Sequence, residues 1–194
     1  LMGHSMGSFL SRTYLVRYPG TVRAAVLMGT GWQKRAVLDG GLALADLLAR
    51  RDPAATNDMV SELAFGAYNK TFKPNRTAYD WLSLDQENVD AYIADPMCGH
   101  DATVGLFREM LRGIRFNQRR ENLRRMDGSI PVLLISGEDD PVGGMGEGVR
   151  RTYQAFRDAG VADCTLKLYP KLRHELLNER AQRETVYQDI WNWM

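Results

Sequence analysis

The chain has 194 residues, of which 44% are apolar and 25% are charged, and its 25 basic residues nearly balance its 24 acidic ones. This length and composition indicate an ordinary soluble globular protein of one domain, or of one domain with an insertion. The near balance of charge argues against a nucleic-acid-binding protein. No apolar run approaches the length of a membrane-spanning helix, and two cysteines are too few for a disulfide framework.

The start of the chain predicts the end of a strand, a tight turn, a helix and a second strand. Residues 6–18 have a helical period that places Met6, Leu10 and Tyr14 on the apolar face and points Arg12 elsewhere. The apolar run VRAAVLMGT follows a Pro-Gly turn and indicates a buried strand. Together these elements are typical of a βαβ unit in a parallel sheet.

The alternation of strand and helix breaks between residues 32 and 128, which contain helical patterns and no convincing strand. Five helices are expected there, over 36–50, 54–65, 86–94 with Asp85 as its N-cap, 103–114 and 117–126. The stretch is too long for a simple crossover between two strands. We therefore expect a core of residues 1–31 and 129–194 and an inserted helical cap of residues 32–128.

The alternation resumes after the cap. IPVLLISG predicts a second buried strand over 130–137, and an amphipathic helix follows over 146–160. CTLKLYP, residues 164–170, alternates with period two and indicates a strand nearer the sheet edge. A terminal helix carries Val186 and Ile190. The predicted fold class is α/β, with a parallel sheet, flanking helices and an inserted helical cap.

Ser5, in the motif GHSMGS, has the surroundings of a nucleophile. A serine that projects from a tight strand-to-helix turn crowds the residues two before and two after it, and Gly3 and Gly7 meet that demand. The helix that starts after Ser5 adds free N–H groups and a positive dipole end. The Met6 N–H is then expected to stabilise an oxyanion.

A serine nucleophile needs a base, and the chain has three histidines. His4 adjoins Ser5 on the turn and is expected to point away from it, in a supporting role. His100 lies in the cap, where an ordinary surface role is expected. His174 lies between a predicted strand and a helix, at the carboxyl edge of the sheet where α/β folds place their chemistry. We therefore assign His174 as the base.

The acid that orients the base is expected in SGEDDPVGG, at the end of the predicted strand 130–137. Glu138, Asp139 and Asp140 compete for this role. Asp140 stands farthest out on the loop and is held in extended geometry by Pro141. The chain order is then Ser5, acid, His174, which is the order of the α/β-hydrolase fold.

At this point the sequence resembles the α/β-hydrolase superfamily, in particular the monoacylglycerol lipase-like and lysophospholipase-like serine hydrolases, often filed with serine aminopeptidases. GHSMGS, SGEDDPVG, RHELLNE and the cap stretch from AYNKTF to DPMCG carry the resemblance. It implies that Asp140 is the triad acid, that the cap roofs an acyl-binding pocket, and that the enzyme uses no metal and no organic cofactor. Candidate lining residues are Phe65, Tyr68, Phe72, Trp81, Phe107 and Met110. For most of them, packing within the cap is the expected role.

The family has roughly a third of its fold before the serine turn, including the loop that supplies the second oxyanion donor. Only Leu1 and Met2 precede Gly3 here. The resemblance therefore implies either a fragment of a longer product, which we favour, or a truncated relative held together by self-association. In both cases the first strand has lost a neighbour. An exposed sheet edge invites pairing with a second copy, so a homodimer is expected if the chain folds alone.

The leading functional hypothesis is a serine hydrolase of carboxylic esters. The resemblance implies that its substrates are lipid esters of the monoacylglycerol or lysophospholipid type. A thioesterase or a small-ester carboxylesterase is the alternative within the enzyme class. The alternative from another class is an inactive truncated hydrolase that acts as an oligomerising or binding module. Partners are a small ester or lipid substrate, with no nucleic acid, and the expected location is cytoplasmic.

Overall fold

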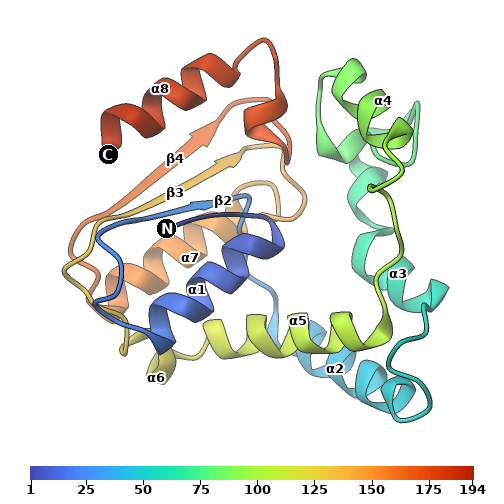
Figure 1. The fold of residues 1–194 in the computed structure, drawn as a ribbon, viewed down its shortest axis with the longest axis horizontal. Helices are drawn as coiled ribbons and strands as arrows, with labels where there is room; N and C mark the ends of the chain where they lie inside the picture. The colour runs from blue at the N-terminus through green and yellow to red at the C-terminus, as the bar shows by residue number, and fades with distance from the viewer.

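Four parallel strands form one sheet, which lies between helices on its two sides (Figure 1). The computed structural model describes residues 1–194, apart from the side chain of Ala64. The strands are β1 (Met2–His4), β2 (Ala25–Met28), β3 (Val132–Gly137) and β4 (Cys164–Tyr169), in the order β1-β2-β3-β4. All neighbours are parallel, and Leu27 of β2 lies opposite Gly3 on one side and Leu134 on the other. The predicted parallel sheet is confirmed, with β4 as an outer strand.

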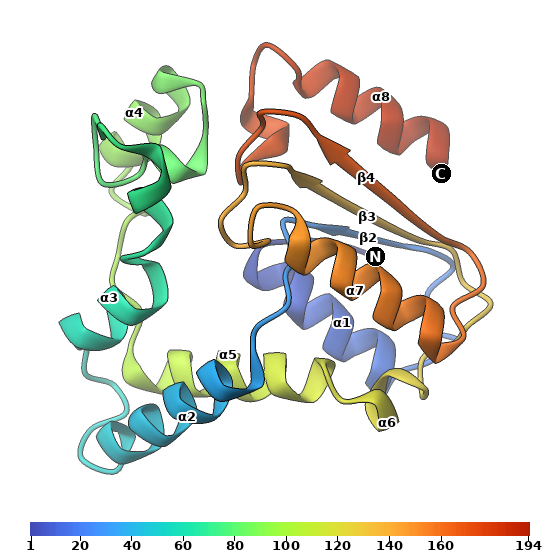
Figure 2. The same cartoon turned by 180° about the vertical axis from the view of Figure 1, so that it is seen from behind.

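Helices cover both faces of the sheet (Figures 1 and 2). α1 (Met6–Arg17) and α7 (Glu147–Ala159) lie on one face, and α8 (Arg183–Trp193) lies on the other. Successive strand residues point to opposite faces. Leu27 therefore shares a buried cluster with Phe156 of α7, whereas Val26 shares one with Ile190 of α8. Because both faces of β2 and β3 are buried, these two strands read as continuous apolar runs, whereas the outer strand β4 alternates.

The region between β2 and β3 holds helices and no named strand among its described residues. They are α2 (Arg35–Ala49), α3 (Asp58–Phe65), η1 (Tyr68–Phe72), η2 (Asp80–Leu82), α4 (Gln86–Ala94), α5 (Val104–Asn117) and α6 (Arg120–Leu123), of which η1 and η2 are 3₁₀ helices. α2 to α4 stand away from the sheet, and α5 returns the chain to it (Figure 2). None of the described helices is long and apolar enough to cross a membrane. We keep the name cap for residues 32–128, and their separation as a domain stays a prediction.

Two cap helices are shorter than predicted. α3 begins at Asp58 rather than at residue 54, because the Asn57 side chain caps it by accepting a hydrogen bond from the Val60 N–H. α6 covers only the four residues Arg120–Leu123 of the predicted helix 117–126, since Asn117 is the last residue of α5 and residues 124–126 form a turn and a bend. The Asp85 cap of α4 is confirmed, since its carboxylate accepts from the Glu87 N–H.

The expected apolar face of α1 does not face the sheet. Leu10 is 61% exposed, and Met6 and Tyr14 are also exposed, whereas Arg12 is fully buried. The Arg12 guanidinium is accommodated because it donates to the Gly31 carbonyl at 2.8 Å and lies beside three aromatic rings. A helical period shows that a face exists, but it cannot show which face meets the sheet.

β1 is the outer strand opposite β4. In the described chain it pairs with β2 alone, so one side of its backbone has no strand neighbour. Leu1 and Met2 at this edge are 45% and 49% exposed. The serine turn therefore lies at an open edge of the sheet.

Candidate active site

Ser5 occupies the turn between β1 and α1 and has an unusual backbone conformation. Its φ is 54° and its ψ is −123°, a region that L-amino acids rarely adopt and that costs about 1–3 kcal/mol. Hydrogen bonds on both sides hold it there. The Ser5 N–H donates to Met28 O at 3.0 Å, and Ser5 O accepts from the Ser8 N–H at 2.9 Å and from the Ser8 hydroxyl at 2.6 Å. Such strain held in place by its surroundings is typical of a functional turn.

Met6 is the first residue of α1, so its N–H has no acceptor within the helix. The residue is exposed, at 42%. The Ser5 carbonyl accepts hydrogen bonds from the Ser8 and Phe9 N–H groups. The Met6 N–H thus remains available beside the serine, as an oxyanion donor requires.

The two glycines of the motif differ in their surroundings. A Cβ on Gly3 would lie 2.3 Å from Gly7 O and 2.4 Å from Ser11 Oγ, whereas a Cβ on Gly7 would meet no heavy atom within 4 Å. The steric demand predicted for Gly3 is confirmed, and that for Gly7 is wrong. Gly3 lies beneath the first turn of α1, while Gly7 is on its open side.

We therefore expect Gly3→Ala and Gly7→Ala to have opposite effects on stability. Gly3→Ala is expected to lower the free energy of unfolding by about 3 kcal/mol, because backbone atoms cannot move aside. Gly7→Ala is expected to raise it by about 0.5 kcal/mol, through the higher helix propensity of alanine. Urea unfolding of the two variants measures both changes. Equal losses would contradict this account.

His174 and Asp140 form a buried pair. His174 Nδ1 lies 3.0 Å from Asp140 Oδ2, and the two residues are 2% and 0% exposed. The other Asp140 oxygen, Oδ1, accepts the Val142 N–H at 2.9 Å, and Oδ2 also accepts the Ser136 hydroxyl at 3.1 Å. A carboxylate with this many donors is held in one orientation. Of the three competing acids, it is Asp140 that the structure places against the imidazole.

The side chains of the other two acids make no hydrogen bond or ion pair with His174 in the described structure. The Glu138 side chain is 43% exposed and lies 4.0 Å from Arg150. Asp139 is half-buried, and its N–H donates to Leu172 O at 3.0 Å, which ties the acid loop to the loop of His174. Neither arrangement orients an imidazole.

Two residues that sequence reasoning did not assign to this site support His174. Gly29 has a φ of 58°, and a Cβ there would lie 3.0 Å from His174 Cε1, so the imidazole occupies space that only glycine leaves. Ser136, described above, is the second. A glycine and a small polar residue at the carboxyl ends of buried strands were the available signals.

His4 has the supporting role expected for it. Its Nε2 lies 3.0 Å from His174 O, and the two rings are 4.6 Å apart. Burial, and then the proximity of His174, lowers the pKa of His4. A neutral His4 that donates from Nε2 to His174 O supports the loop without adding a charge beside the imidazole.

Ser5 follows His4 in the chain, and the His4 ring lies beside the ring of His174. This places Ser5 near the Asp140–His174 pair. Ser5 Oγ makes no hydrogen bond to His174 in the described structure. Hydrogen bonds of catalytic groups are often long or misaligned until substrate binds. The structure thus joins the acid and the base directly and brings the serine to the same edge of the sheet.

Four of the six candidate lining residues gather into one aromatic cluster. Tyr68 and Trp81 have rings 5.1 Å apart, Phe65 lies 6.0 Å from Tyr68, and Phe107 lies 5.6 Å from Phe65. Trp81 connects the cluster to the site, since its ring is 5.3 Å from that of His174. Burial, and then the charge of Asp140, raises the pKa of Tyr68 to about 12. The hydroxyl of Tyr68 is therefore neutral near the site.

The remaining two lining candidates are not part of the ring-to-ring contacts. Met110 packs against the buried cluster that includes Phe9 and Ile114, and Tyr68 and Trp81 pack against the same cluster. Phe72 lies under the Arg173 guanidinium, with 4.0 Å between Arg173 Cζ and the centre of the Phe72 ring. It therefore contacts the loop of His174 rather than the aromatic cluster.

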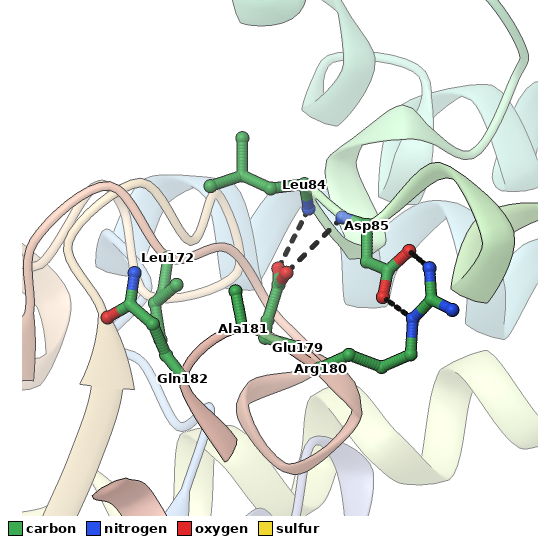
Figure 3. A pocket seen from close by; sticks show the side chains of 7 residues that line it. All are labelled: Leu84, Asp85, Leu172, Glu179, Arg180, Ala181 and Gln182. Atoms are coloured by element: carbon green, nitrogen blue, oxygen red, sulfur yellow. Dashed lines mark hydrogen bonds and ion pairs between the residues drawn. The ribbon is translucent and has the colours of Figure 1, made fainter. Parts of the chain in front are cut away.

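A pocket of about 520 Å³ lies at the seam between the cap and the loop that follows β4 (Figure 3). Its lining residues are Leu84, Asp85, Leu172, Glu179, Arg180, Ala181 and Gln182. Ser5, Asp140 and His174 are not among them, so this pocket is distinct from the serine turn.

A family model described as serine aminopeptidase, S33, matches residues 1–181. The chain is 30% identical over 200 residues to a monoacylglycerol lipase of Mycolicibacterium smegmatis, with 100% of this chain and 61% of that protein covered. A thermostable carboxyl esterase from Bacillus coagulans, solved in complex with glycerol, superposes with a TM-score of 0.90 at 26% identity. That match covers 99% of this chain and 62% of the esterase.

A monoacylglycerol lipase of Paleococcus ferrophilus has the same fold, with a TM-score of 0.73 at 22% identity, and the match covers 100% of this chain and 66% of the lipase. The chain thus spans less than two thirds of the length of these similar proteins.

Proposed function

The chain belongs to the serine aminopeptidase S33 family and has the α/β-hydrolase fold, and on this premise we propose that it is a serine hydrolase of carboxylic esters. The observation that carries the proposal is the buried Asp140–His174 pair, with 3.0 Å between Oδ2 and Nδ1, beside the strained Ser5. A buried acid, an imidazole and a half-buried turn serine together make a nucleophile that none of them makes alone.

In the proposed mechanism Ser5 Oγ attacks the acyl carbon of the ester, and His174 Nε2 takes the hydroxyl proton. The His174 Nδ1–H donates to Asp140, which fixes the tautomer and stabilises the imidazolium. The Met6 N–H stabilises the oxyanion of the tetrahedral intermediate. His174 then returns its proton to the leaving alcohol, and water hydrolyses the acyl-enzyme by the same sequence of transfers.

The proposed substrate is a lipid monoester of the monoacylglycerol or lysophospholipid type. The similarity to a monoacylglycerol lipase supports this class. The aromatic cluster that ends at Trp81, 5.3 Å from His174, offers an apolar surface for an acyl chain. A small-ester carboxylesterase is the second candidate, favoured by the similarity to the Bacillus coagulans esterase.

A fluorophosphonate probe and a panel of esters test this proposal. We expect the probe to label Ser5, and kcat/KM to rise with acyl length from acetyl to decanoyl glycerol esters. A preference for acetyl esters would favour the small-ester alternative. Labelling that survives Ser5→Ala would contradict the nucleophile.

The test is made on this chain and on a longer protein that contains it, because the similar proteins extend beyond the matched region. Labelling of the longer protein alone would make this chain an inactive module, and labelling of neither would reject the hydrolase. A homodimer through the open edge of β1 and a cytoplasmic location stay predictions. Light scattering of the purified chain tests the first of these.

A further inference from the structure

The loop that carries His174 is joined to the cap by a continuous series of contacts. Its partner is the cap segment 80–85, which contains η2 and the turn before α4. The contacts start on both sides of His174. Arg173 and Glu175 are its chain neighbours, and the Glu175 N–H donates to Leu82 O at 2.8 Å. The cap and the base loop are therefore linked within one residue of the imidazole.

Arg173 makes the contact on the other side of His174. Its Nη1 donates to Ser83 O at 3.1 Å and also to Asp80 O. Its guanidinium lies over the Phe72 ring, as described above. These contacts hold the two ends of η2 against the base loop, because the Asp80 and Ser83 carbonyls flank Trp81 and Leu82.

Glu179 completes the series from farther along the loop (Figure 3). It is 3% exposed, and its Oε1 accepts the Leu84 N–H at 2.8 Å while its Oε2 accepts the Asp85 N–H at 3.2 Å. Arg180 beside it pairs with the Asp85 carboxylate, with 2.8 Å between Nη2 and Oδ1. Both oxygens of the buried carboxylate are thus used to hold one cap turn.

A buried carboxylate is an unfavourable way to gain stability. Burial raises the pKa of Glu179, which shows that removal from water disfavours its charged form. Replacing buried ionic groups by apolar ones is often neutral or stabilising. A carboxylate does, however, offer a separate acceptor oxygen to each of the two N–H groups, whereas a glutamine amide has only one acceptor oxygen.

We propose that Glu179 is a positioning residue that sets the acyl selectivity of the site through Trp81. The cap turn that it holds follows η2, and Trp81 of η2 lies between His174 and the aromatic cluster. With the turn fixed, Trp81 is a rigid wall beside the imidazole. This inference rests on the proposed esterase function, and it concerns the acyl site rather than the nucleophile.

The test compares Glu179→Gln with Glu184→Gln, an exposed glutamate of α8 that pairs only with its neighbour Arg183 in the described chain. Glutamine keeps the size of Glu179 but turns an NH₂ group toward one of the two N–H donors. We expect the ratio of kcat/KM for p-nitrophenyl decanoate to that for p-nitrophenyl acetate to fall about tenfold. The fluorophosphonate labelling rate of Ser5 is expected to stay unchanged. Glu184→Gln is expected to change neither quantity.

Two further measurements separate positioning from a merely structural role. In a Trp81→Leu background, Glu179→Gln is expected to have no further effect on the selectivity ratio, because the group through which it acts is gone. Hydrogen exchange of the Leu84 and Asp85 amides is expected to accelerate in Glu179→Gln, whether or not the chain is active. If Glu179→Gln does not fold, Glu179→Asp carries the same test, since it keeps the charge but shortens the side chain by one methylene and so withdraws the carboxylate from the Leu84 and Asp85 N–H groups.

An unchanged selectivity ratio in an active protein would overturn the inference and leave the proposed function intact. An equal loss on both esters, with a matching loss of labelling, would also overturn it. A wild-type protein that neither labels nor hydrolyses esters would instead reject the proposed function. Unchanged amide exchange in Glu179→Gln would then reject the positioning role independently of activity.

Discussion

Ser5→Gly is expected to abolish ester hydrolysis and at the same time to make the protein more stable than Ser5→Ala. Either variant removes the nucleophile, so kcat/KM is expected to fall by about 10⁴-fold or more. The variants differ in the backbone. Alanine keeps the strained conformation at φ 54° and ψ −123°, whereas glycine adopts it freely.

The difference in stability follows from two opposing terms. Relief of the strain is worth about 1–3 kcal/mol, and the greater freedom of glycine in the unfolded chain offsets about 0.5–1 kcal/mol of it. The free energy of unfolding of Ser5→Gly is therefore expected to exceed that of Ser5→Ala by about 1 kcal/mol. Urea unfolding and ester turnover measure the two effects, with the exposed Ser129→Ala as the control. A less stable glycine variant would show that the turn stores no strain.

Asp140→Asn is expected to lower kcat/KM by about 10³–10⁴-fold with little change in the shape of the site. The Val142 N–H donates to Oδ1 at 2.9 Å, so the amide oxygen of asparagine must stay there. The amide NH₂ then takes the position of Oδ2, 3.0 Å from His174 Nδ1. It forces Nδ1 to accept, which leaves the proton on Nε2. An imidazole protonated at Nε2 cannot take the proton of Ser5.

Asp139→Asn is the matched control for this prediction, because it makes the same chemical change one residue earlier. Its turnover is expected to remain within about threefold of wild type, as for a surface change outside the site. Steady-state kinetics on one ester decides between the two positions. Unchanged turnover in Asp140→Asn, with a loss in Asp139→Asn, would move the acid to Asp139 despite the observed geometry.

The candidate site was predictable to the extent that it depends on chain order and strand ends. Ser5, Asp140 and His174 each follow a predicted strand, and the carboxyl ends of parallel strands meet at one edge of a sheet. The residues around them were not predictable in the same way. Ser136 and Gly29 have their roles because of where an imidazole from residue 174 comes to lie, and no local pattern records that position.

The contacts between the cap and the base loop show the same limit more strongly. Glu179 and the Leu84 N–H are 95 residues apart in the chain, and neither stands in a periodic pattern that points to the other. Gly3 and Gly7 appear equivalent in the motif, yet only Gly3 lies beneath backbone atoms. Pairs of this kind depend on how whole elements pack, and packing is a property of the folded chain.

Hydrophobic periodicity and turn residues were enough to predict the four parallel strands, the flanking helices and the helical region between β2 and β3, because these are local consequences of backbone geometry. They were not enough to predict which face of α1 is buried. Its predicted apolar face of Met6, Leu10 and Tyr14 is exposed, whereas Arg12 is fully buried. A charged side chain can be buried there because carbonyls and aromatic rings from distant segments receive it. Those partners meet Arg12 only once the sheet and its helices have assembled.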